Sequence, residues 1–362
     1  MTKQVLCLIS KAPDENRARC LAGALMRDTG AQVSFEFADR EQGRRAVAAR
    51  IAARLQERFD LVYLEGTGIA AGWPLLLAGR KGQKYLVSSG DPISGFVKTT
   101  SGPLQGRAFG YYERLLMRGC TGFVGWTPYL TGRALELGAP RAITVEGGAD
   151  RTIFHSPSPQ EKQQARQRFG IAQNHIVCVV VGSLQWNQRQ SYSYGLELIE
   201  LLRYLKRSDV SMLIVGDGTG KTVLESRLRI EDQQRVIFTG RLPQNEVTMA
   251  LHAADIGFVT QTLDGLGNYR LTTKLPEYLA SGLGIAMSPV PGFYDYVFDA
   301  GWPLPARHPA SENFHRGCAK WLDALTRQEI SRKSARAIQI AKERFDAEDL
   351  AKRFSRFVQD IW

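Results

Sequence analysis

The chain has 362 residues, of which 44% are hydrophobic and 23% are charged, so its composition is that of a globular protein and excludes a disordered one. This length is too great for one ordinary domain and comfortable for two. No apolar run approaches the roughly 20 residues needed to cross a bilayer, and the apolar run at the start is too short for a signal-peptide core. We therefore expect a soluble, cytoplasmic protein of two domains.

The net charge of +11 is spread over both halves of the chain. Six arginines fall in one predicted helix of the first half: Arg40, Arg44, Arg45, Arg50, Arg54 and Arg58. Two interpretations stay open, a solvated helix face whose Arg stems cover apolar surface, or peripheral contact with anionic lipid at the inner face of the membrane. Nucleic acid is disfavoured as a partner, because basic and aromatic residues are not interleaved.

The cysteines are five, an odd number, without the spacing of a Cys/His metal site. Cys7 and Cys178 lie inside apolar, strand-like runs, where a thiol behaves as a small hydrophobic group. We expect free thiols in a reducing compartment and no metal site.

Apolar strand-like runs alternate with helical stretches in the first half, as in parallel α/β layers. The predicted strands are Val5–Ile9, Val33–Phe37, Leu61–Leu64, Tyr85–Ser88 and Phe123–Val124. Helices are predicted between them at Arg17–Arg27 and Arg44–Arg58.

The second half repeats this alternation. Its predicted strands are Ile176–Val181, Ser211–Val215, Val236–Thr239, Ile256–Val259 and Gly284–Met287. Its predicted helices are Gly195–Leu205, Thr222–Arg229, Gln244–Ala253 and Leu275–Ser281.

A Gly- and Pro-rich segment from Glu146 to Pro159 separates the two arrays, and a new helix is predicted to begin near Gln160. We place the first domain at residues 1–158 and the second at 159–340. Residues 341–362 carry aromatic and aliphatic residues at helical spacing. They predict a closing helix that packs back toward the first domain.

Two glycine turns follow strands of the second domain. The turn from Gly216 fits neither nucleotide fingerprint, because a P-loop needs Gly where Val215 stands and a dinucleotide motif needs Gly where Lys221 stands. The turn from Gly182 leads to Arg189, which is either a cationic partner for a diphosphate or a surface arginine. Both turns lie where α/β proteins bind ligands, at the carboxyl ends of strands.

The helix predicted from Leu275 follows Thr272, Thr273 and Lys274, so exposed amides and an ammonium group meet at its start. This combination predicts an anion site. Glu277, one turn further, either accepts hydrogen bonds from ribose hydroxyls or only complements the helix dipole.

The order of these motifs resembles the C-terminal domain of the retaining GT-B glycosyltransferases of family four. The resemblance rests on five segments in one fixed order: Cys178–Ser183, Met212–Gly218, Val236–Pro243, Leu251–Ile256 and Lys274–Gly282. It implies an α/β fold of two Rossmann-like domains with a cleft between them. It also implies transfer of a sugar from a nucleotide diphosphate, with retention and without a metal or other cofactor.

The resemblance also implies roles for single residues. Glu277 matches the second Glu of the family's Glu-x7-Glu motif and would hold the ribose, whereas Tyr269 stands where the first Glu belongs. Thr272 and Thr273 match the phosphate loop, Arg189 falls near the diphosphate Lys, and Ser183 replaces a frequent Arg. The remaining donor-site positions are Gly182, Gly216, Arg241 and Leu242, of which the last two fall near the nucleobase.

The predicted function is therefore transfer from a UDP- or GDP-linked sugar to a glycan or lipid-linked acceptor, in glycan biosynthesis. Arg189 and Lys274 would stabilise the departing diphosphate. Asp91 would orient or deprotonate the acceptor hydroxyl, or else only cap the turn before Pro92. Two alternatives remain, a non-catalytic GT-B protein acting as a binding or scaffold partner, and a glycosyltransferase with a nucleic-acid acceptor.

Overall fold

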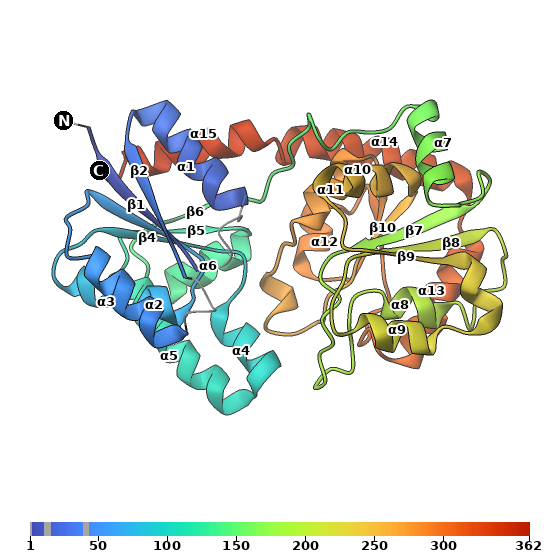
Figure 1. Cartoon of the computed structure of the whole chain (residues 1–362), viewed down its shortest axis with the longest axis horizontal. Coiled ribbons are helices and arrows are strands. Elements are labelled where there is room, and N and C mark those ends of the chain that lie inside the picture. The colour runs from blue at the N-terminus through green and yellow to red at the C-terminus, as the bar shows by residue number, and fades with distance from the viewer. Residues whose placement is uncertain (1, 11–15, 39–42) are drawn as a thin grey trace. The chain divides into compact units, whose positions relative to one another are not determined.

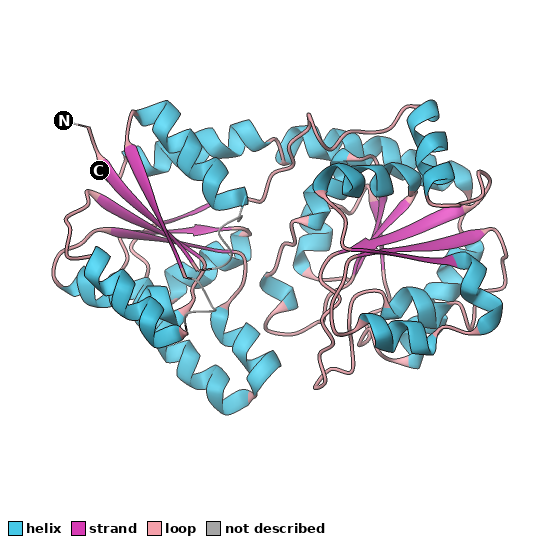
Figure 2. Ribbon diagram, in the orientation of Figure 1, coloured by secondary structure: helices cyan, strands magenta, loops and turns pink. Residues whose placement is uncertain are grey.

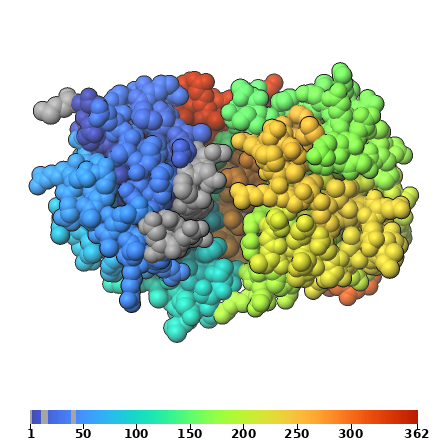
Figure 3. All heavy atoms as spheres, viewed as in Figure 1, coloured from blue at the N-terminus to red at the C-terminus, as the bar shows by residue number. Residues whose placement is uncertain are grey.

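The computed structural model describes residues 2–10, 16–38 and 43–362, which form two compact α/β units (Figure 1). Unit 1 contains Met1–Gly147, Tyr269–Leu271 and Ala347–Trp362. Unit 2 contains Gly148–Asn268 and Thr272–Asp346. The packed atoms of both units are drawn in Figure 3, with the residues outside the described ranges in grey.

The sheet of unit 1 is parallel and six-stranded, in the order β2-β1-β3-β4-β5-β6. Figure 2 shows the strands of the protein in magenta and its helices in cyan. Its strands are β1 (Gln4–Ile9), β2 (Gln32–Phe37), β3 (Leu61–Glu65), β4 (Tyr85–Ser89), β5 (Gly122–Gly125) and β6 (Ala142–Thr144). Since all six strands run the same way, their carboxyl ends share one edge of the sheet.

Helices cover both faces of this sheet, because its strands are apolar on both sides. Leu6 and Leu8 face a core completed by α2 (Arg44–Arg54), α3 (Ile69–Arg80), α5 (Pro103–Gly119) and α6 (Pro128–Glu136). Val5, Cys7 and Ile9 face α1 (Asn16–Thr29) and α15 (Ala347–Gln359). The helix α4 (Ile93–Ser101) packs on α5.

Unit 2 has a second parallel sheet of six strands, in the order β12-β11-β10-β7-β8-β9. These strands are β7 (Ile176–Val181), β8 (Val210–Val215), β9 (Val236–Gly240), β10 (Ile256–Val259), β11 (Gly284–Met287) and β12 (Gly301–Pro303). The helices are α7 (Pro159–Arg168), α8 (Leu196–Leu201), α9 (Lys221–Arg227), α10 (Gln244–Ala253), α11 (Lys274–Ala280), α12 (Pro291–Tyr296), α13 (Glu312–Ala324) and α14 (Arg327–Arg344). The helices α8 and α13 bury one face of the sheet, while α7 packs on α10 and α11 on α14.

The ten predicted strands are all present, and β6 and β12 were missed because each has only three residues, too few for a pattern of alternation. Several predicted helix ends were wrong; α8, for example, ends at Leu201 where the prediction ran to Leu205. The arginine-rich helix stops at Arg54 with Leu55 as its C-cap, so Arg58 lies beyond it, and Arg40 lies outside the described residues. The expected single helix over 341–362 is the end of α14 and a separate α15, broken where the Phe345 carbonyl accepts a hydrogen bond from the Ala149 N–H.

No helix among the described residues is long and apolar enough to span a membrane. The five cysteines are free thiols, and all are buried except Cys20.

Candidate functional site

Two glycine loops touch at the carboxyl edge of the sheet in unit 2. The Gly182 N–H donates to the Val215 carbonyl at 2.9 Å, and the Gly216 N–H donates to the Gly240 carbonyl at 2.9 Å. Gly182 (φ 145°) and Gly216 (φ 142°) both have φ angles that residues with a side chain rarely adopt. A Cβ atom on Gly216 would lie 1.8 Å from the Gly182 carbonyl oxygen. The close approach of the loops therefore requires glycine at 216.

The ammonium group of Lys274 lies directly beside the Gly182 turn. A Cβ built on Gly182 would come within 2.9 Å of the Lys274 Nζ, and this Nζ lies 3.3 Å from the centre of the Tyr194 ring. Tyr194 thus attracts the ammonium through its ring face. The result is a cation held next to backbone that is bare of side chains, where an anion can approach closely.

A buried side chain, Glu197, interacts electrostatically with this lysine. Its side chain accepts hydrogen bonds from the Tyr192 hydroxyl at 3.0 Å, the Gly195 N–H at 3.1 Å and the Thr260 hydroxyl at 2.8 Å. Burial raises the pKa of Glu197, and the charge of Lys274 opposes that rise. Sequence reasoning missed Glu197, because the three groups that hold it come from two separate segments.

Glu277 shares the electrostatic environment of Lys274. Burial raises the pKa of Glu277 to about 7, with the Lys274 charge acting in the opposite direction. The next residue fixes α11 against the sheet, since the Tyr278 hydroxyl accepts a hydrogen bond from the Val181 N–H at 2.8 Å. A carboxylate and an ammonium group are thereby presented from one helix close to the end of β7.

The other predicted donor-site residues of unit 2 lie as follows. Ser183 is exposed next to Gly182, and Arg241 (exposed) and Leu242 (half-buried) directly follow β9. Thr273 is exposed at the start of α11. Thr272 is buried, and its hydroxyl has no hydrogen-bond partner among the described residues.

Arg189 is exposed in the turn between Asn187 and Tyr192, where its backbone N–H donates to the Asn187 side chain at 3.0 Å. Among the described residues, no hydrogen bond or ion pair involves its guanidinium group. The structure therefore does not bring Arg189 into contact with Lys274.

Asp91 and Tyr269 are predicted site residues of unit 1. The Asp91 carboxylate pairs with the Arg270 guanidinium at 2.9 Å. The carbonyl of Tyr269 accepts a hydrogen bond from the Thr127 hydroxyl at 2.8 Å, and its ring centre lies 5.5 Å from the Arg133 guanidinium. Arg270 was missed as a partner, because no sequence pattern links positions 91 and 270.

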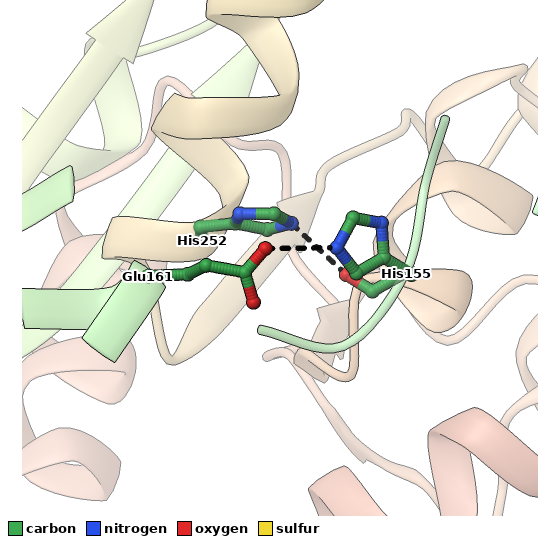
Figure 4. A group of neighbouring side chains, drawn as sticks. All are labelled: His155, Glu161 and His252. Atoms are coloured by element: carbon green, nitrogen blue, oxygen red, sulfur yellow. Dashed lines mark hydrogen bonds and ion pairs between the residues drawn. The ribbon is translucent and has the colours of Figure 1, made fainter. Parts of the chain in front are cut away.

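One group of described side chains has the composition of a metal site: His155, Glu161 and His252 (Figure 4). Glu161 accepts a hydrogen bond from the Ser158 N–H at 2.7 Å and caps α7, which lowers the pKa of Glu161 to about 2. The His252 Nε2 contacts the His155 carbonyl at 3.1 Å, and burial lowers the pKa of His252. Glu161 thus has a role as part of the cap of α7, and His252 of α10 contacts the segment that precedes this cap.

Comparison with known proteins agrees with this geometry in unit 2. Residues 175–322 match the family described as glycosyl transferases group 1. The 2-deoxystreptamine glucosyltransferase of Streptomyces kanamyceticus is 27% identical over 189 residues, which are 51% of this chain and 47% of the relative. The match thus spans about half the length of that relative. The family match over residues 175–322 includes Gly182, Gly216, Lys274 and Glu277.

Solved structures match the whole chain. HepE of Anabaena, in complex with UDP and glucose, has a TM-score of 0.72 at 16% identity and covers 99% of this chain and 100% of its own. WaaG, a glycosyltransferase involved in lipopolysaccharide biosynthesis, has a TM-score of 0.71 at 17% identity. The match covers 98% of this chain and 99% of the WaaG chain. The fold is GT-B. Its two Rossmann-like units are the two parallel sheets with their flanking helices.

Proposed function

We propose that this GT-B protein is a glycosyltransferase that takes a sugar from a nucleotide diphosphate. The observation that carries the proposal is the Lys274 ammonium beside the side-chain-free turn at Gly182, with Glu277 one helical turn further. The match of residues 175–322 to glycosyl transferases group 1 supports it, because the match includes all three positions.

In this proposal the donor diphosphate lies over the backbone of Gly182 and Gly216. Lys274 neutralises charge on the phosphate, the backbone amides at Thr272 and Thr273 donate hydrogen bonds to it, and Glu277 accepts hydrogen bonds from the ribose hydroxyls. Arg241 and Leu242 meet the nucleobase. Ser183 lies beside the diphosphate. Arg189 reaches the diphosphate when the exposed turn that carries it moves.

The proposed reaction breaks the bond between the anomeric carbon and the diphosphate oxygen, and the acceptor hydroxyl forms the new bond with retention of configuration. Negative charge grows on the departing diphosphate, where Lys274 stabilises it without a metal. Asp91 orients the acceptor hydroxyl and takes its proton, and the ion pair with Arg270 fixes the position of the Asp91 carboxylate.

The acceptor in this proposal is a glycan or a lipid-linked molecule. The protein acts in glycan biosynthesis in the cytoplasm, with Arg44 and Arg45 of α2 in contact with anionic lipid. UDP-glucose is the first donor to test, because HepE was solved with UDP-glucose and the relative from S. kanamyceticus is named a glucosyltransferase.

A second candidate is a non-catalytic GT-B binding protein. It is favoured by Tyr269 and Ser183, which replace two charged residues of the family pattern, and by the contact of the Tyr269 ring with Arg133. Release of free UDP from UDP-glucose separates the two functions, since a binding protein releases none.

The experiment is a thermal-shift screen of UDP-, GDP- and dTDP-sugars, followed by a turnover assay with each ligand that binds. A ligand that binds only the native state raises its melting temperature. We expect one nucleotide class to raise the Tm and to be consumed. No shift with any nucleotide sugar would contradict the proposal.

A further inference from the structure

Unit 1 contains a cavity of about 640 Å³ at the carboxyl edge of its sheet. Ser10 follows β1, Ala38 follows β2, and Gly68 at the start of α3 follows β3, and all three line it. The carboxyl edge of a parallel sheet is where α/β proteins bind small ligands. The volume equals that of about 20 water molecules, so the cavity is large enough for a sizeable organic group.

The wall of this cavity is mainly hydrocarbon. Val47 of α2, Ile69 of α3, and Ile93, Phe96 and Val97 of α4 contribute aliphatic and aromatic surface. Phe96 is 44% exposed, so its ring is accessible to an occupant of the cavity. This wall gains free energy when an apolar group displaces water from it.

The polar groups of the cavity define the occupant further. No carboxylate is among its described lining residues, and Arg44 is their one charged residue. The Ser10 hydroxyl, also part of the lining, has no hydrogen-bond partner among the described residues. Arg44 and the Ser10 hydroxyl can therefore contact the polar part of an occupant whose apolar part lies on the hydrocarbon wall.

We propose that this cavity binds an apolar group of the acceptor, so that the acceptor is amphipathic, with a hydroxyl-bearing polar part and a hydrocarbon part. The proposal rests on the proposed function and specifies its substrate class. Ile93 of the lining follows Asp91 by two residues, which puts the apolar site close in sequence to the candidate that orients the acceptor hydroxyl.

The test is calorimetry of the full chain with hexyl, heptyl and octyl glucoside below their micelle concentrations, with glucose and phenyl glucoside as further probes. We expect affinity to rise about fourfold for each added methylene while the alkyl chain fits the cavity. An alkyl series of this kind indicates a lipid acceptor, and preference for phenyl glucoside indicates an aromatic one. Equal, weak binding of every glucoside and of glucose would overturn the proposal.

Two variants locate the binding. Ala70→Phe fills the cavity from the first turn of α3, and Phe96→Gln makes its wall polar; each should weaken octyl glucoside binding at least tenfold. Phe298→Gln is the matched control, because Phe298 is 60% exposed and belongs to unit 2. An equal effect of Phe298→Gln and Phe96→Gln would overturn the assignment to this cavity.

UDP binding is measured in parallel and distinguishes the two proposals. Cavity variants that bind UDP normally but no longer bind octyl glucoside support the proposal that the cavity binds the apolar group of the acceptor. Wild-type protein that binds octyl glucoside but no nucleotide sugar contradicts the proposed function alone.

Discussion

At the scale of single residues, Lys274 is the centre of the candidate donor site. It is held between the Tyr194 ring and the Gly182 turn, and it interacts electrostatically with the buried Glu197. We expect Lys274→Ala to lower kcat by roughly a hundredfold, as does the loss of one oxyanion-hole donor. Lys274→Arg should recover part of the loss because it keeps the charge. Initial rates of UDP release measure this, with Lys320→Ala as the control at an exposed position.

Glu277 should make nucleotide binding depend on pH. Its pKa near 7 leaves it partly protonated at neutral pH, and the carboxylate accepts stronger, charge-assisted hydrogen bonds from the ribose hydroxyls than the neutral acid does. UDP-glucose affinity should therefore rise as pH increases through about 7 and level off above it, because the diphosphate diester of this ligand does not itself titrate in this range. Glu277→Gln should bind UDP-glucose more weakly at pH 8 and show a flat profile. A wild-type profile equally flat between pH 6 and 8 would remove Glu277 from the site.

The same pKa has a consequence for stability without ligand. A carboxyl group whose pKa is raised in the folded state contributes fully to folding stability at pH values below its pKa in the unfolded chain, near 4.5. This contribution is lost as the pH rises through about 7. Glu277→Gln should therefore raise the Tm at pH 8 and change it little at pH 4.5. Calorimetric melting at the two pH values measures this difference.

At the scale of elements, α2 is shorter and less available than the sequence predicts. Arg50 pairs with Glu36, and Arg54 with Glu57, so these two arginines already have partners. Lipid binding by α2 would rest on Arg44 and Arg45. We expect Arg44→Gln with Arg45→Gln to reduce co-sedimentation with anionic vesicles, and high salt to do the same. If neither the substitutions nor high salt changes the amount of protein that co-sediments with the vesicles, the arginines of α2 form only a solvated helix face.

The strands were predictable because each is a short apolar run bounded by turn residues, and Ile176–Val181 and Ile256–Val259 have the predicted bounds. The glycine turns were found for the same reason, since they follow strands directly. Glu197 and the Asp91–Arg270 pair were not, because each depends on segments that only the folded chain brings together. The break between α14 and α15 depends on contacts of Phe345 and Asp346 with Ala149, which helical spacing does not report.

At the scale of the whole molecule, the proposed chemistry makes no use of a metal. Lys274 and backbone amides occupy the role that a bound cation has in metal-dependent transferases. We expect full activity in EDTA, measured as transfer with the donor found in the thermal-shift screen. Loss of activity with EDTA and recovery with Mg²⁺ or Mn²⁺ would contradict this mechanism, and His155→Ala would then test the His155, Glu161 and His252 group as the metal's site.

The helix α15 ends the chain but belongs to the unit that begins it. Phe354 is fully buried, its ring centre lies 5.2 Å from that of Tyr63 in β3, and Leu350 and Val358 join the same core. During synthesis, the first 147 residues therefore leave the ribosome without the helix that covers one face of their sheet. Residues 148–346 emerge before α15 and contain all of unit 2, so unit 2 can finish folding first. A nascent chain stalled before residue 347 should have a protease-resistant second unit and a protease-sensitive first unit, and release of the full chain should protect both.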